Sequence, residues 1–144
     1  MHSIPRNRGT AREITLRRML TAYPLACFTG AFLTDVTYVR STQFMWADFS
    51  IWLITGGMMG GVLAAVSGVL GTVVRRRRGE RRPFRWVYVL GTALMLVLGL
   101  VNAFVHSRDG WTSVVPGGIT LSAVVGVLAI VTGWMLYSNT GEVR

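Results

Sequence analysis

The chain has 144 residues, of which 51% are hydrophobic and only 15% are charged. Because soluble domains carry about a quarter of their residues as charged side chains, this composition excludes an ordinary soluble protein. The formal net charge of +9 comes from fifteen arginines set against six acidic residues. These arginines flank long uncharged stretches, so we expect them to meet anionic lipid head groups and expect no nucleic-acid partner.

Four stretches are apolar enough to cross a membrane, which requires about twenty residues of helix. In chain order they are 19–39, 49–74, 86–105 and 111–137. The first contains one acid, Asp35, and the third has Asn102 as its only strongly polar residue. The stretches lack the alternation of an outer-membrane β-strand, and open strand edges are not tolerated in lipid. The sequence therefore predicts an all-α membrane protein with four transmembrane helices.

The rest of the chain is divided by these spans. We expect a basic segment, a transmembrane domain, a basic loop inside that domain and a short tail, at 1–18, 19–137, 75–85 and 138–144. The connections between spans have about nine, eleven and five residues, although Pro116 marks a second possible start for the last span. Since short connections make consecutive helices pack antiparallel, the expected architecture is an up-down four-helix bundle.

The arginines predict the orientation of this bundle. An even number of spans places both termini and the 75–85 loop on one side, which holds thirteen of the fifteen arginines. The other side holds only Arg40 and Arg108. The positive-inside rule places the arginine-rich side in the cytoplasm, so we expect a multi-pass protein of the bacterial inner membrane.

The basic loop has a second expected role. Its arginines lie next to the ends of two spans, where each contributes about 1 kcal/mol near an anionic surface. We therefore expect them to bind lipid head groups. They are Arg75, Arg76, Arg77, Arg78, Arg81, Arg82 and Arg85.

Small residues recur at four-residue spacing in every span, and this spacing lets helix backbones approach closely. The positions expected to pack helices together are Gly30, Gly57, Gly61, Gly99, Gly118 and Gly126. The stretch Gly56–Gly61 has an alternative use, as the contact of a homodimer or the seat of a flat cofactor. The sequence leaves both uses open.

The topology predicts a polar cluster at the outer end of the bundle. An acid inside a span is costly unless it is paired or near water, so we expect Asp35 to face inward and to pair with Arg108 or Arg40. The expected members are Asp35, Tyr38, Arg40, Asp48, Asn102, His106, Arg108 and Asp109. One interpretation is an ion-pair network that closes the rim. The other is a proton, ion or quinone-headgroup site in which His106 titrates.

No motif of a known enzyme class is present, whether a nucleophile elbow, a P-loop, a dinucleotide fingerprint or a zincin helix. Ligation of a haem by two histidines would need a second inward histidine, and the other one, His2, lies in the polar N-terminal segment. A zinc site fails because Cys27 lies deep in its span, away from His106. We expect no enzyme, no metal and no cofactor.

Three blocks of residues carry a family resemblance. They are Tyr23–Phe28 leading to Asp35, Met45–Ser50, and Asn102–Trp111. With them, nearly the whole chain resembles the DUF2231 family of small bacterial membrane proteins. The resemblance implies a four-helix inner-membrane protein near respiratory or redox enzymes. Many members look to have His-Pro where this chain has Tyr23–Pro24, so any metal or haem site built on that histidine in relatives is in doubt here.

These observations lead to three functional hypotheses. The first is a non-enzymatic structural or accessory protein, which forms a homo-oligomer or serves as a subunit or anchor of a larger membrane complex. The second is a cytochrome-like or quinone-interacting redox bundle, based on bundle size and on His106 with Arg108. The third is a small oligomeric transporter or proton-coupled channel centred on Asp35.

Overall fold

The computed structural model describes residues 8–79, 86–108 and 110–138. They form α1 (Arg8–Ser41), α2 (Phe44–Arg77), α3 (Trp86–His106), a short 3₁₀ helix η1 (Gly110–Ser113) and α4 (Gly117–Ser138). Each α-helix contains a stretch that can cross a bilayer. The stretches are Met19–Ser41, Phe44–Val74, Val89–His106 and Gly117–Met135. Over the described residues the chain is therefore an all-α protein with four helices long and apolar enough to span a membrane, as its composition predicts.

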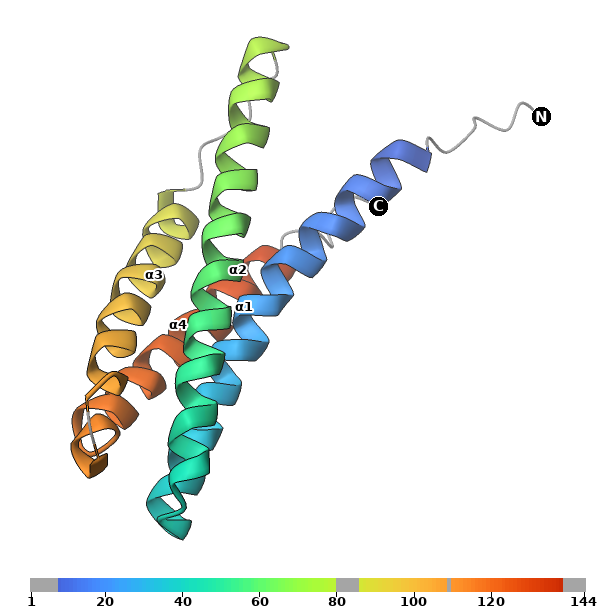
Figure 1. The fold of residues 1–144 in the computed structure, drawn as a ribbon. Coiled ribbons are helices and arrows are strands. Elements are labelled where there is room, and N and C mark those ends of the chain that lie inside the picture. Colours follow the sequence, from blue (N-terminus) through green and yellow to red (C-terminus); the bar gives the residue numbers. More distant parts are fainter. Residues whose placement is uncertain (1–7, 80–85, 109, 139–144) are drawn as a thin grey trace.

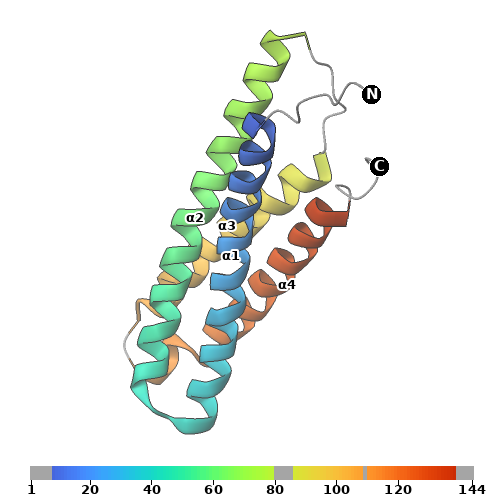
Figure 2. The same ribbon diagram turned by 90° about the vertical axis from the view of Figure 1, so that its right-hand side faces the viewer.

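The four α-helices form a ring of contacts, in which α1 packs on α2, α2 on α3, α3 on α4, and α4 on α1. Opposite corners of this ring hold α1 and α3. At one end of the bundle, α1 leads into α2 and α3 leads into α4; we call this the hairpin end (Figures 1 and 2). The other end holds the last turn of α2, and we call it the arginine end. The helices lie close at the hairpin end and spread apart toward the arginine end.

The turn between α1 and α2 is tighter than expected. Only residues 42–43 separate the two helices, because α2 begins at Phe44, five residues before the expected start at 49. Thr42 adopts a left-handed φ of 55° and its N–H donates to the carbonyl of Tyr38 at 2.8 Å. This arrangement ends a helix within one residue, so the chain reverses at once.

The last span begins later than expected, at Gly117 and not at residue 111. Pro116 explains the difference, because a proline disfavours helical conformation in the residue before it and suits the start of a helix. The residues before it form η1 instead, so the connection from α3 to α4 is longer than the five residues expected.

The first helix begins earlier than the expected span. It starts at Arg8, inside the basic segment expected at 1–18.

The core lies between all four helices. Phe28 of α1, Ile54 of α2, Met95 of α3 and Val125 of α4 form one buried cluster, in which Phe28 is 1% exposed. Large apolar side chains on the outward faces are exposed, such as Trp52 at 75%. This inverted distribution is suited to a lipid surrounding, in which outward apolar side chains are already solvated.

The glycines expected to pack helices lie against neighbouring side chains or backbone. Gly30 lies against Leu53, Gly57 against Cys27 and Phe28, Gly61 against Leu96, Gly99 against Met58 and Phe28, Gly118 against Ser113 and His106, and Gly126 against Phe28 and Phe32. In the stretch Gly56–Gly61, considered above as a seat for a second copy or a flat cofactor, the glycines lie against side chains of α1 and α3 of the same chain.

The arginines expected to bind head groups fall only partly within the described residues. Arg76 and Arg77 end α2, Arg78 follows, and all three are exposed. Gly79 then adopts a φ of 78°, which ends the helix without the strain that a side chain would cause. The side chain of Arg75 and the residues Arg81, Arg82 and Arg85 lie outside the described part of the chain, as do 1–7 and 139–144.

Two glycines of α2 provide a matched test of this packing. A methyl group added at Gly57 would lie 3.0 Å from Phe28 Cε1 and 3.1 Å from Cys27 Cβ, whereas one added at Gly68 would meet no atom of the described residues within 4 Å. We expect Gly57→Ala to lower the free energy of unfolding in detergent micelles by about 1–3 kcal/mol through overpacking. Gly68→Ala should be neutral or slightly stabilising. Equal effects of the two substitutions would contradict this packing of α1 on α2.

Candidate functional site

Two serines differ from most hydroxyl-bearing residues of the spans, because their hydroxyl groups form hydrogen bonds to a neighbouring helix. Several threonines donate to a carbonyl three or four residues earlier in the chain, as is usual in lipid; they are Thr34, Thr37, Thr55, Thr72, Thr120 and Thr132. Ser50 of α2 instead donates to the carbonyl of Ala31 in α1 at 3.2 Å. Ser122 of α4 accepts from the side-chain amide of Asn102 in α3 at 2.8 Å. Both serines therefore join separate helices.

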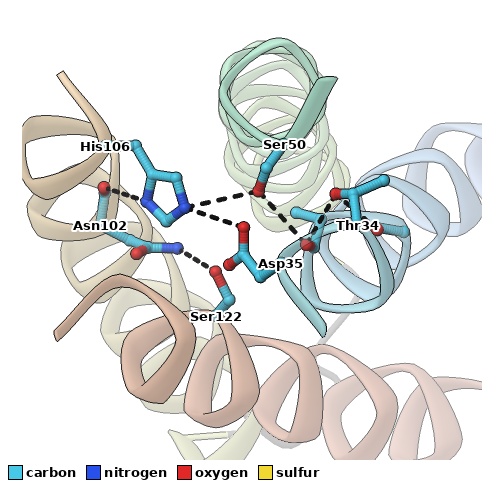
Figure 3. A network of polar contacts seen from close by, with 8 residues as sticks. Thr34, Asp35, Ser50, Asn102, His106 and Ser122 are labelled. Carbon is cyan, nitrogen blue, oxygen red and sulfur yellow. Dashed lines mark hydrogen bonds and ion pairs between the residues drawn. The ribbon is translucent and has the colours of Figure 1, made fainter. Parts of the chain in front are cut away.

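The centre of this polar cluster is a contact between Asp35 and His106 (Figure 3). His106 Nε2 lies 3.0 Å from Asp35 Oδ1, and the two side chains are 1% and 0% exposed. Asp35 belongs to α1 and His106 to α3, which occupy opposite corners of the bundle. The contact therefore crosses the middle of the bundle, while Ser50 and Ser122 lie on the two remaining helices.

The hydrogen bonds determine how many protons the pair holds. His106 Nδ1 lies 3.1 Å from the carbonyl of Asn102, which can only accept, so Nδ1 carries a hydrogen. On the other side of the ring, Nε2 faces Asp35 Oδ1 and, at 3.4 Å, the hydroxyl oxygen of Ser50. The Ser50 hydroxyl already donates to Ala31, so it too can only accept. One proton therefore lies between Nε2 and Oδ1, and it joins the two side chains in a hydrogen bond.

This proton count explains how the pair is tolerated at its depth. Asp35 lies six residues before the end of α1, or about 9 Å along the helix. An isolated charge there would be expensive, whereas a hydrogen-bonded pair without net charge compensates for much of the desolvation. Asp35 is accordingly turned into the bundle and fully buried.

Gly118 at the start of α4 fixes the position of the imidazole ring. A methyl group added there would lie 2.5 Å from the carbonyl oxygen of Ser113 and 2.8 Å from His106 Cε1. The backbone of α4 thus packs directly against the ring, and no larger residue fits. Together with the Nδ1 bond to Asn102, this contact holds Nε2 toward Asp35.

The same geometry affects whether His106 is available to coordinate a haem iron or another metal ion. In this arrangement both imidazole nitrogens already have hydrogen-bond partners, the carbonyl of Asn102 at Nδ1 and the carboxyl group of Asp35 at Nε2. Within the described residues no group of three or more His, Cys, Asp or Glu side chains could hold a metal ion. A metal ion at His106 would therefore have to displace one of these two hydrogen bonds.

Two buried oxygen atoms of the cluster have no hydrogen-bond partner among the described residues. They are Asp35 Oδ2 and Asn102 Oδ1. A buried acceptor left without a donor costs about 1–3 kcal/mol. Asp35 therefore uses one oxygen to hold His106 and keeps the other available for a further donor.

The structure corrects the pairing expected for Asp35, because its partner is His106 and not Arg108 or Arg40. Arg40 follows five residues later, which is about 140° around the helix, so its side chain cannot face the interior with Asp35. Arg40, Arg108 and Asp48 are exposed, and none of them joins the cluster. Asp109 lies outside the described residues.

Of the remaining expected members, Asn102 and His106 are in the cluster and Tyr38 lies beside it. Tyr38 is buried with Ala47 and Val114 in a second small core at the hairpin end. Ser50 and Ser122 were not expected in the cluster. A signal for both exists in the sequence, because each is a hydroxyl in an apolar span at the level of Asp35 or Asn102.

Substitutions of the pair test whether it holds the bundle together. Asp35→Asn leaves His106 without its carboxylate, and we expect a loss of about 3 kcal/mol in the free energy of unfolding. His106→Gln should cost a similar amount, and the double variant should lose less than the sum, with a coupling energy of about 1–3 kcal/mol. Asp48→Asn, at the exposed acid of the same end, should change stability by less than about 0.5 kcal/mol. Strict additivity of the two substitutions would show that the side chains do not interact.

Comparison with known proteins places this fold and cluster in a family. No curated protein and no solved structure matches the chain significantly. The model of the family described as predicted membrane protein (DUF2231) matches residues 14–135. The matched region includes all four described spans and every described residue of the Asp35–His106 cluster. The chain therefore belongs to the DUF2231 family of predicted membrane proteins.

Proposed function

We propose that the protein is a non-enzymatic accessory protein of the bacterial inner membrane, with both termini in the cytoplasm. In this role it is a preformed four-helix unit that binds a larger membrane complex through its lipid-facing surface. The main support for the proposal is that the central polar side chains form hydrogen bonds with one another. Both nitrogens of His106 and one oxygen of Asp35 are used to join α1 to α3. A cluster of this kind stabilises one arrangement of helices.

A stripe on α2 is the surface best suited to such a partner. Met45, Phe49, Trp52, Met59 and Leu63 follow one another at helical spacing, and each is more than half exposed. Trp52 lies eight residues into α2, about 12 Å from its start, whereas tryptophans facing lipid prefer the interface. No described residue accepts a hydrogen bond from its indole N–H. A partner helix with a carbonyl or hydroxyl acceptor would satisfy this group at a depth where water cannot.

Both parts of the proposal are tested in intact cells. A photo-crosslinking amino acid at position 52 should give a protein adduct of defined mass, while the same group at Val127, which is 59% exposed on α4, should label lipid only. An adduct of twice the chain mass would identify a second copy as the partner. Lipid labelling alone at both positions would overturn the role.

The orientation is tested with a membrane-impermeant maleimide added outside the cells. It should modify Arg40→Cys and spare Arg78→Cys, and the reverse pattern would refute the proposed orientation.

The Asp35–His106 pair also supports a second candidate function, proton exchange. One proton lies between the two side chains, Asp35 Oδ2 has no donor among the described residues, and His106 is the last residue of α3, at the hairpin end. A proton could therefore enter from that end and reach the carboxyl group through the imidazole ring. In this candidate an oligomer completes the path across the membrane.

Flux measurements distinguish the two functions. If protons pass through the pair, proteoliposomes of the wild-type protein should dissipate an imposed pH gradient, and Asp35→Asn should abolish the flux. Asp48→Asn should leave it unchanged, since that carboxyl is exposed and outside the cluster. Equal flux in Asp35→Asn and the wild type, or no flux from the wild type, would exclude proton passage and leave the accessory role.

A further inference from the structure

The spread of the helices at the arginine end leaves a hollow between all four of them. Its volume is about 30 Å³, and Leu25, Ala64, Met95 and Gly133 contribute one wall each, from α1, α2, α3 and α4. The hollow is separated from the Asp35–His106 pair by the buried core around Phe28. Sites for drug-sized molecules or cofactors have volumes of about 300–1,000 Å³, so this one is too small for a haem or a quinone ring.

The walls of the hollow are mainly apolar. The Thr132 hydroxyl, which also lies there, donates to the carbonyls of Leu128 and Ala129 in its own helix and is not available to a ligand. Its position suits the membrane leaflet on the arginine side. Thr132 and Gly133 lie about 9 Å before the end of α4, while each leaflet contributes about 15 Å of hydrocarbon. The end of an alkyl chain from that leaflet matches both the chemistry and the depth.

The face of α2 that leads outward from the hollow is open. Gly68 and Gly71 follow Ala64 along the helix, and a methyl group at either glycine would meet none of the described part of the chain within 4 Å. The two views in Figures 1 and 2 show this part of α2 standing apart from the other helices. Beyond it comes Arg78, which is exposed and whose N–H still donates to the carbonyl of Val74. Arg78 lies fourteen residues after Ala64, about 40° around the helix and about 21 Å along it, which is close to half the thickness of a bilayer with its headgroup layers.

We propose that the hollow and this face of α2 bind one anionic phospholipid of the arginine-side leaflet. The end of an acyl chain occupies the hollow, the chain lies along Gly68 and Gly71, and the phosphate meets Arg78. A positive charge at the level of the head groups complements an anionic lipid, which a zwitterionic lipid would match less well. The Asp35–His106 pair holds the helices together at the hairpin end. At the arginine end, the lipid fills the space between the helices.

Retention of lipid by the purified full chain tests the site. The protein is reconstituted in phosphatidylcholine vesicles that contain a minor share of phosphatidylglycerol, extracted in mild detergent and weighed by native mass spectrometry. The wild type should retain one phosphatidylglycerol. Ala64→Phe, which fills the hollow, should lose it, and Ile130→Phe, at an exposed position of α4, should keep it. Gly133→Val provides a second filled variant, and helical circular dichroism verifies that each variant folds.

The arginines are tested in the same preparation. Arg78→Gln should lose the phosphatidylglycerol, whereas Arg77→Gln, about 140° around α2 from Ala64, and Arg40→Gln with Arg108→Gln, at the hairpin end, should keep it. The proposal is overturned if the wild type retains no phosphatidylglycerol or keeps phosphatidylcholine equally well. It is also overturned if the folded filled variants retain as much lipid as the wild type, or if a lipid-free dimer shows that a second copy occupies this face.

Discussion

The hydrogen bond between Asp35 and His106 is the interaction on which the arrangement of this bundle depends. In a membrane, apolar side chains gain little by leaving lipid for a protein interior, so packing and polar contacts must determine how helices associate. Here, neighbouring helices pack closely at glycines. The two helices α1 and α3, which lie across the bundle from each other, are joined by the Asp35–His106 contact, and this hydrogen bond fixes their distance at the hairpin end.

The burial of the pair and the shape of the bundle are linked. Two charges of opposite sign can remain in an apolar span only if their geometry is good and their remaining hydrogen-bonding groups have partners. Ser50, Asn102 and the backbone at Gly118 supply that setting from the surrounding helices. The hairpin end is therefore compact, whereas the arginine end, which has no comparable contact among its described residues, spreads and exposes α2. The hairpin end is therefore suited to holding the helices together, and the arginine end is suited to binding lipid.

The sequence predicts the membrane class, the number of spans and the identity of three central residues, because composition and apolar run length report directly on lipid. It fails where the answer depends on rotation about a helix axis. Asp35 was expected to meet an arginine, since opposite charges at one level suggest a pair, but Arg40 faces another direction and His106 is the inward group. The serines were missed for the same reason: a hydroxyl in a span usually bonds to its own helix, and only the rotation of α2 and α4 directs Ser50 and Ser122 toward their neighbours.

The most direct test of the central interaction is a distance measured in lipid. Magic-angle-spinning NMR of the protein in bilayers, with ¹⁵N in histidine and ¹³C in aspartate, reports the dipolar coupling between His106 Nε2 and the carboxyl carbon of Asp35. A nitrogen 3.0 Å from Oδ1 predicts a clear coupling. Absence of that coupling, with the His106 signal resolved, would show that α1 and α3 are not joined by this pair.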